Sequence, residues 1–176
     1  MNSYRTLMLI NLLLCLGACS TMQSLNENMP WYAANEVESI GLQVSYDAQL
    51  QHAISVDVVF VYDENLSALL TSASATQWFQ EKPGYLASYG HQMHILHREI
   101  VPGYNELINT LPQDHKDAKA VFAFANYTNN PNTKATLSVY TTPWLLFDAQ
   151  NMALLTQRPQ AQSDASDGGS ANGRNR

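Results

Sequence analysis

Residues 54–62 read ISVDVVFVY, a run in which β-branched and aromatic side chains fill nearly every position. Such side chains favour extended backbone, and a run of this length without glycine or proline is typical of a strand in the middle of a sheet. A period-two pattern precedes it, because Ile40, Leu42 and Val44 alternate with small or polar residues. Two strands joined by a short polar loop at residues 47–53 predict a mainly β protein.

Further segments of strand-like composition follow, separated by turns that contain glycine, proline or asparagine. About seven short strands divided by such turns are typical of a β-sandwich, which is the fold we predict. The last of them is expected at the edge of its sheet, since Pro143 at its start cannot donate a hydrogen bond to a neighbouring strand. The further strands are expected at residues 91–101, 118–128, 135–140 and 143–147, and residues 104–111 are expected to form a strand or a bridging segment.

Between the second and third strands the apolar residues change to helical spacing. Asp63 can cap a first short helix, and a second is expected over residues 74–82, with Trp78 and Phe79 as its apolar pair. Pro83-Gly84 is expected to end the second helix, because proline lacks the backbone N–H that a helix interior needs. The sandwich should therefore carry a short helical insertion. The apolar side of the first helix consists of Leu66, Leu69 and Leu70.

The chain starts with a leader, MNSYRTLMLINLLLCLGAC, over residues 1–19. One arginine precedes an apolar run at residues 7–16, which is shorter than the roughly twenty residues of a permanent membrane span. A charged start, an apolar run and small residues, in this order, are typical of a secretory signal peptide. The leader ends in LGAC, which resembles the lipobox of bacterial lipoproteins. This resemblance implies cleavage after Ala18 and attachment of diacylglycerol and an N-acyl chain to Cys19.

Lipidation would occupy the sulfur of Cys19, and Cys15 would leave with the leader, so no disulfide is expected. Two or three acyl chains anchor a protein stably, whereas a single chain is marginal. Ser20 follows the modified cysteine, at a position where aspartate is the usual signal for retention at the inner membrane. The protein is therefore expected at the inner leaflet of the outer membrane, with its folded part in the periplasm. Membrane lipid is then a partner, and no cofactor other than the covalent lipid is expected.

The rest of the chain divides by composition. After the signal peptide at residues 1–18, residues 19–35 are polar without an apolar period and are expected to form the lipid anchor and tether. Residues 36–156 contain the strands and are expected to form the sandwich domain. Residues 157–176 lack large apolar side chains and are rich in serine, asparagine, glycine and aspartate, so we expect a disordered tail.

The charge balance limits the classes of partner. The chain has nine Lys+Arg against fifteen Asp+Glu, without a basic cluster, which argues against nucleic-acid binding because phosphate neutralisation needs concentrated cations. Residues 20–156 hold five basic and thirteen acidic side chains, a net charge of −8. A partner surface that meets this domain is expected to be neutral or basic.

The residue patterns also argue against catalysis and metal binding. On a strand, His91 and His97 share one face while His94 points to the other, so the three cannot converge on a metal ion. The sequence has neither a G-x-S-x-G elbow nor a glycine-rich phosphate loop outside the tail. We therefore expect no enzyme activity, no metal and no small-molecule substrate. Two acidic pairs fit a solvated surface or a helix cap, namely Glu36/Glu38 and Asp63/Glu64.

The order of several segments along the chain matches that of a known protein family. The lipobox is followed by VSYDAQLQHAISVDVVFVY at residues 44–62 and by an insertion with Leu69 and Phe79. The turn Pro102-Gly103 then precedes the apolar strand VFAF at residues 121–124. Together these features resemble the outer-membrane lipoprotein of the type VI secretion system, the TssJ family, also named SciN or VasD. The Trp78-Phe79-x-x-Lys82 pattern in the insertion departs from the main branch, as expected of a divergent member.

This resemblance implies a transthyretin-like β-sandwich with added helices. It also implies a structural role, in which the lipoprotein tethers the inner-membrane protein TssM to the outer membrane by binding its periplasmic carboxy-terminal domain. Part of that contact would use the loop between the first two strands. The matching residues here are Asp47, Ala48, Gln49, Leu50, Gln51 and His52.

One alternative belongs to a different functional class. An envelope lipoprotein could bind a small ligand or a peptidoglycan fragment in a cleft of the sandwich. The side chains expected to line such a cleft are Trp78, Tyr85, Tyr89 and His94.

Overall fold

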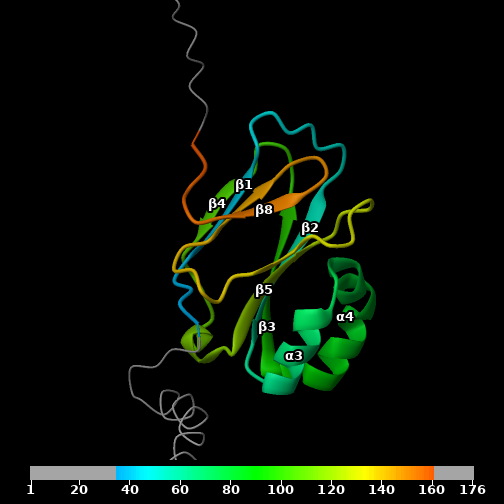
Figure 1. The fold of residues 1–176 in the computed structure, drawn as a ribbon, viewed down its shortest axis with the longest axis vertical. Helices are drawn as coiled ribbons and strands as arrows, with labels where there is room; N and C mark the ends of the chain where they lie inside the picture. Colours follow the sequence, from blue (N-terminus) through cyan, green and yellow to red (C-terminus); the bar gives the residue numbers. More distant parts are fainter. Residues whose placement is uncertain (1–34, 161–176) are drawn as a thin grey trace, which may run out of the picture.

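The computed structural model describes residues 35–160, which form two four-stranded sheets packed face to face, with two helices against one of them (Figure 1). The strand orders are β4-β1-β7-β8 in the first sheet and β3-β2-β5-β6 in the second. The predicted β-sandwich with a helical insertion is therefore confirmed, with eight strands instead of about seven. Cys19, the signal peptide, nearly all of the predicted tether and most of the predicted tail lie outside the described residues.

The elements follow one another in the order that the sequence predicts, with the helices between the second and third strands. The strands are β1 Ile40–Val44, β2 Ile54–Val61, β3 Met93–Ile100, β4 Asn105–Ile108, β5 Ala120–Ala125, β6 Lys134–Thr136, β7 Trp144–Phe147 and β8 Met152–Leu155. The helices are α3 Glu64–Ser72, α4 Ala75–Tyr89, and the short 3-10 turns η1 Gly90–Gln92 and η2 His115–Asp117.

The core between the sheets follows from the alternation along β1 and β2. Every second residue of these strands points into this layer and is at most 5% exposed. β2 pairs with β3 on one side and with β5 on the other, so it has the central position that its composition predicts. The inward residues of β1 and β2 are Ile40, Leu42, Val44, Ile54, Val56, Val58 and Phe60.

The opposite face of β2 and β5 is covered by α3 and α4 (Figure 1). Asp63 caps α3 as predicted, because its carboxylate accepts a hydrogen bond from the Leu66 N–H at 2.8 Å. Leu66 and Leu70 are buried, whereas Leu69, predicted on the same apolar side, is 39% exposed. Trp78 is fully buried and stacks on an aromatic ring of β5 at a centroid distance of 5.0 Å. The helices thus enclose a second core beside the one between the sheets.

The predicted end of the second helix at Pro83-Gly84 is wrong, because α4 continues through both residues. Pro83 removes one helical hydrogen bond, the one that an N–H at this position would donate to the Phe79 carbonyl. Two contacts of Tyr85 compensate for this lost hydrogen bond. The Tyr85 ring stacks on Trp78 at a centroid distance of 5.6 Å, and its hydroxyl donates to the Glu81 carboxylate at 2.9 Å. The last turns of α4 are therefore held by a tertiary contact that helix-stop rules do not include.

Pro83→Ala should stabilise the protein, because it restores the missing bond to the Phe79 carbonyl. We expect the free energy of unfolding to rise by about 1–2 kcal/mol, since the helical gain is partly offset by a more flexible unfolded chain. Urea denaturation measures this change. Gly84→Ala is the matched control: its Cβ meets no atom within 4 Å, and it should raise stability only by roughly 0.5–1 kcal/mol through helix propensity. A loss of stability in Pro83→Ala would contradict this account of α4.

The predicted edge position of the last strand is also wrong. β7 lies between β1 and β8, and the edge is formed by β8, a strand that the sequence pattern does not predict. Pro143 lies just before β7, so its missing N–H removes no bond from the ladder, and its carbonyl accepts a hydrogen bond from the Gly41 N–H at 2.9 Å. The turn into β8 is formed by Asp148, whose carboxylate accepts from the backbone N–H groups of Gln150 and Asn151 at 2.7 Å.

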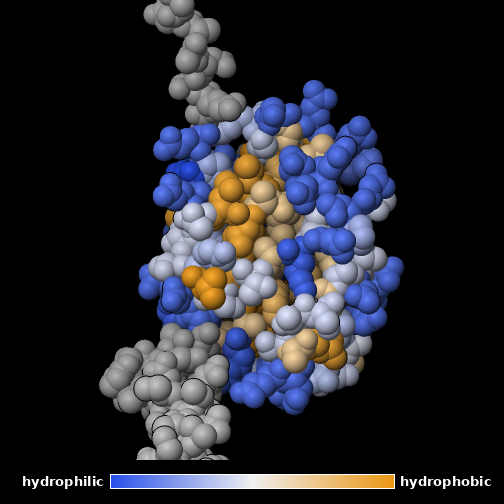
Figure 2. All heavy atoms as spheres, in the orientation of Figure 1, coloured by the Kyte–Doolittle hydropathy of each residue, from blue (hydrophilic) through white to orange (hydrophobic). Residues whose placement is uncertain are grey.

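On the face of the molecule drawn in Figure 2, hydrophobic side chains gather over β1 and β8 of the first sheet. Trp144 of β7 lies across Gly41 of β1, and a Cβ at position 41 would be 2.1 Å from a ring atom of Trp144. The Arg158 guanidinium lies 5.3 Å from the Trp144 ring centroid, within the range of a cation–π contact. Close packing, and not a turn, therefore requires glycine at position 41.

Candidate functional site

The start of the described chain and the β1–β2 loop lie at opposite ends of the sandwich (Figure 1). The Asn35 side-chain amide donates to the carbonyls of His115 and Ala118 at 2.6 and 3.2 Å, near the end where Val61 of β2 pairs with Ala120 of β5. β1 runs from there to residues 45–53, the loop that leads into β2. We call the two ends the tether end and the loop end. A tether that enters at Asn35 leaves the loop end facing away from it.

The predicted contact residues lie in this loop, and their side chains separate into two sets. Ala48 and Leu50 are half-buried and pack against the core between the sheets. Asp47 accepts a hydrogen bond from the Ser45 hydroxyl, which lowers the pKa of the Asp47 carboxyl below its ordinary value. The apolar residues thus hold the loop on the domain while polar ones face solvent. The exposed members are Asp47, Gln49, Gln51 and His52.

Three further connections lie at the loop end, at residues 101–104, 126–133 and 148–151. The first touches both ends of the β1–β2 loop: Ile100 pairs with Ile54, and the Tyr104 carbonyl accepts from the Val44 N–H at 2.9 Å. The other two are joined to each other by the Tyr127 hydroxyl, which donates to the Asp148 carbonyl at 3.0 Å. The sequence predicts the turn at Pro102-Gly103 but not its place beside the loop.

A buried carboxylate lies outside this surface, in the middle of β2 and under α4. Asp57 of β2 is fully buried and accepts hydrogen bonds from the Trp78 indole N–H at 2.9 Å and the Lys82 ammonium at 2.8 Å. Its second oxygen is 2.7 Å from a ring nitrogen of His97. A buried charge needs such partners to offset its desolvation. These hydrogen bonds connect α4 to β2 of the second sheet. Because the partners occupy both carboxylate oxygens, Asp57 is not free to bind a ligand.

The three histidines singled out in the sequence do not come together. His91 lies in η1, His94 is exposed on β3, and His97 contacts Asp57 and, through its other ring nitrogen, Glu99 at 3.0 Å. Within residues 35–160, no group of three or more His, Cys, Asp or Glu side chains is arranged to hold a metal ion. His94 and His97 lie on opposite faces of β3 as predicted, whereas His91 lies in η1, before the strand, and not on the strand predicted at residues 91–101.

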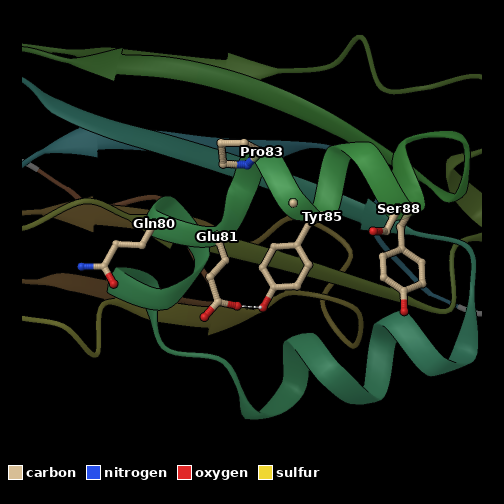
Figure 3. Close-up of a pocket in the computed structure, with 7 residues that line it drawn as sticks. Gln80, Glu81, Pro83, Tyr85 and Ser88 are labelled. Carbon is tan, nitrogen blue, oxygen red and sulfur yellow. Dashed lines mark hydrogen bonds between the residues drawn. The ribbon is translucent and has the colours of Figure 1, made fainter.

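The alternative ligand cleft is not formed as predicted. A hollow of about 380 Å³ lies on α4, and Tyr85 and Tyr89 line it (Figure 3). Trp78, however, is fully buried, and His94 does not line the hollow. Burial, together with the adjacent Glu81 carboxylate, raises the pKa of Tyr85 to about 12. Of the four residues expected to line the cleft, only Tyr85 and Tyr89 therefore line this hollow.

Comparisons with known proteins concern the fold. No protein-family model matches the chain, and no curated protein matches its sequence. The crystal structure of the type VI secretion lipoprotein TssJ1 from Pseudomonas aeruginosa aligns with 70% of this chain and 97% of its own, with a TM-score of 0.52 and 12% identity. The chain has the TssJ fold.

Two further solved structures align less closely with this TssJ-like sandwich. Serratia marcescens Lip, described as a membrane-bound component of the type VI secretion system, gives a TM-score of 0.48 and 10% identity over 69% of this chain and 96% of its own. A structure described as the TssM C-terminal domain from EAEC gives 0.49 and 14% over 66% and 95%. As for the membrane, none of the helices between residues 35 and 160 is long and apolar enough to cross a bilayer.

Proposed function

We propose that the protein is an outer-membrane-anchored periplasmic lipoprotein with a structural, non-catalytic role in a type VI secretion membrane complex. The observation that carries this proposal is the position of the β1–β2 loop, at the end of a TssJ-like sandwich opposite to Asn35. A lipid anchor before Asn35 would place the membrane on one side of the domain and the loop on the other. This arrangement suits a protein that links the outer membrane to something further inside the envelope.

The tether length fits this role. Cys19 lies sixteen residues before Asn35, which allows a reach of at most about 55 Å if fully extended. The acyl chains on Cys19 would be the only covalent groups required, and the domain would need no small-molecule substrate. Lipid attachment and a short tether would confine the loop end to a layer close to the outer membrane, where an inner-membrane partner must reach it.

The partner we propose is the periplasmic domain of a TssM-like inner-membrane protein, bound through the loop that contains residues 47–52. Four exposed side chains of this loop are available without unfolding the domain, and Asp47 contributes a negative charge. A contact at the loop end would leave the hydrogen bonds from Trp78 and Lys82 of α4 to Asp57 intact, because these bonds lie under the helices.

Affinity isolation from detergent-solubilised membranes tests the proposal. The tagged protein should recover an inner-membrane secretion protein, and a triple alanine variant of the loop should recover at least tenfold less, since exposed contact residues can dominate binding without affecting the fold. A triple alanine variant at the tether end should behave like the wild type. Recovery of no inner-membrane secretion protein by the wild type would contradict the proposal. The loop variant changes Gln49, Gln51 and His52, and the control changes Asn109, Thr110 and Gln113, all exposed.

A further inference from the structure

We infer that the partner surface includes the β3–β4 turn at residues 101–104, and that Tyr46 and Val101 form its apolar centre. This inference rests on the proposed function and adds to it a second segment and the chemistry of the partner. The occupant is a protein domain that offers an apolar depression bordered by lysine or arginine side chains.

The turn and the loop form one continuous surface. Ile100, the last residue before the turn, pairs with Ile54, the first residue after the loop. On the other side, the Tyr104 carbonyl accepts from the Val44 N–H at 2.9 Å, directly before the loop begins. Each end of the loop is therefore held beside one end of the turn, and the two segments lie side by side at the top of Figure 1.

Two large apolar side chains are exposed on these adjacent segments. Tyr46 is 71% exposed at the start of the loop, and Val101 is 45% exposed at the start of the turn. Pro102 lies next to Val101 and is also exposed. An aromatic residue surrounded by smaller apolar groups is the usual composition of an interface centre, where tyrosine contributes large contact area at low entropic cost. The polar residues of the loop then form the rim.

The turn is held by hydrogen bonds within the chain. Gly103 has φ of +78°, a left-handed conformation that permits the tight reversal, and the Tyr104 N–H donates to the Val101 carbonyl at 3.0 Å. Behind it, Glu106 accepts from the Arg98 guanidinium at 2.9 Å and from the Tyr104 hydroxyl at 2.5 Å. A surface fixed in this way loses little conformational entropy on association, which favours binding.

The charges at the loop end have one sign. The four connections at this end, residues 45–53, 101–104, 126–133 and 148–151, contain no lysine or arginine. Their carboxylates are Asp47 and Asp148, and the first of these accepts a hydrogen bond from the Ser45 hydroxyl. A partner with cationic side chains around an apolar depression complements this arrangement, and these rim charges would speed the encounter more than they would hold the complex.

The test uses the full-length lipoprotein in detergent and the full-length inner-membrane protein that affinity isolation recovers. Tyr46→Ala should weaken the dissociation constant at least tenfold and Val101→Ser at least threefold, as expected for central interface residues. Val139→Ser is the matched control, because Val139 is 68% exposed but adjoins the tether end, where the Ser138 carbonyl accepts from the Glu36 N–H. The control should bind within twofold of the wild type, and all three variants should unfold at the wild-type temperature.

The outcomes separate the inference from the function on which it rests. If the wild type recovers no inner-membrane protein, the proposed function itself fails. If the loop triple variant weakens binding while Tyr46→Ala and Val101→Ser bind within twofold of the wild type, the loop is the site but this extended surface is wrong. Asp47→Asn combined with Asp148→Asn should slow association and reduce its dependence on salt concentration. An unchanged association rate would overturn the assignment of a cationic partner rim.

Discussion

Changing Cys19 to serine should remove the protein from the outer membrane. Serine cannot form the thioether that carries diacylglycerol, so the chain would lose the acyl groups that make anchoring stable. Sucrose-gradient fractionation should find the wild type with outer-membrane markers and the variant elsewhere. Mass spectrometry of the mature chain should detect the acyl groups on the wild type alone.

The neighbouring cysteine supplies the control. Cys15 lies four residues earlier in the leader and, under this account, is discarded before the mature protein forms. Cys15→Ser should therefore leave both localisation and the mature mass unchanged. An outer-membrane location for Cys19→Ser, or an effect of Cys15→Ser equal to that of Cys19→Ser, would contradict lipidation at Cys19.

Trp78→Ala should produce the largest loss of stability of any substitution considered for the folded domain. The side chain is fully buried, stacks between Tyr85 and Phe124, and donates its indole N–H to Asp57. Truncation of a buried tryptophan typically lowers the free energy of unfolding by about 3–5 kcal/mol, and the loss of a donor to a buried carboxylate adds to it. Because whole domains have stabilities of about 5–15 kcal/mol, this change should bring the domain near unfolding.

Urea denaturation with fluorescence or circular dichroism measures this effect. Leu86→Ala is the matched control on the same helix, since Leu86 is 45% exposed and should lose less than about 1 kcal/mol. Trp78→Phe should fall between the two, because it keeps most of the ring but not the hydrogen bond to Asp57. A loss of under about 1.5 kcal/mol in Trp78→Ala would show that α4 is not held by this side chain.

The parts of the fold that depend on local chemistry could be predicted from the sequence. The β-branched run of β2 and the cap at Asp63 both depend on residues close together in the chain, and both are confirmed. The continuation of α4 beyond Pro83 depends instead on Tyr85 reaching Trp78, and the burial of Trp78 excludes it from the predicted cleft. The inner position of β7 follows from its parallel pairing with β1, a contact between segments about a hundred residues apart.

The candidate site likewise combines features that local sequence predicts with features that depend on contacts between distant segments. The β1–β2 loop lies between two strong strand patterns, so its exposed residues could be predicted from the sequence. That the turn at Pro102-Gly103 lies beside it depends on how β3 pairs with β2 and β4 pairs with β1, one pairing in each sheet. The partners of Asp57 could not be predicted for the same reason, since Lys82 and His97 come from a helix and a strand whose packing no local pattern specifies.

Site-specific photo-crosslinking in living cells tests the central claim most directly. A benzophenone amino acid at Gln49 places the probe at the loop end, and one at Gln113, also an exposed glutamine, places it at the tether end. We expect an irradiation-dependent adduct between the Gln49 variant and an inner-membrane secretion protein, with no such adduct from Gln113. An adduct from Gln113 alone, or none from either position, would contradict the proposal that the loop end binds this partner.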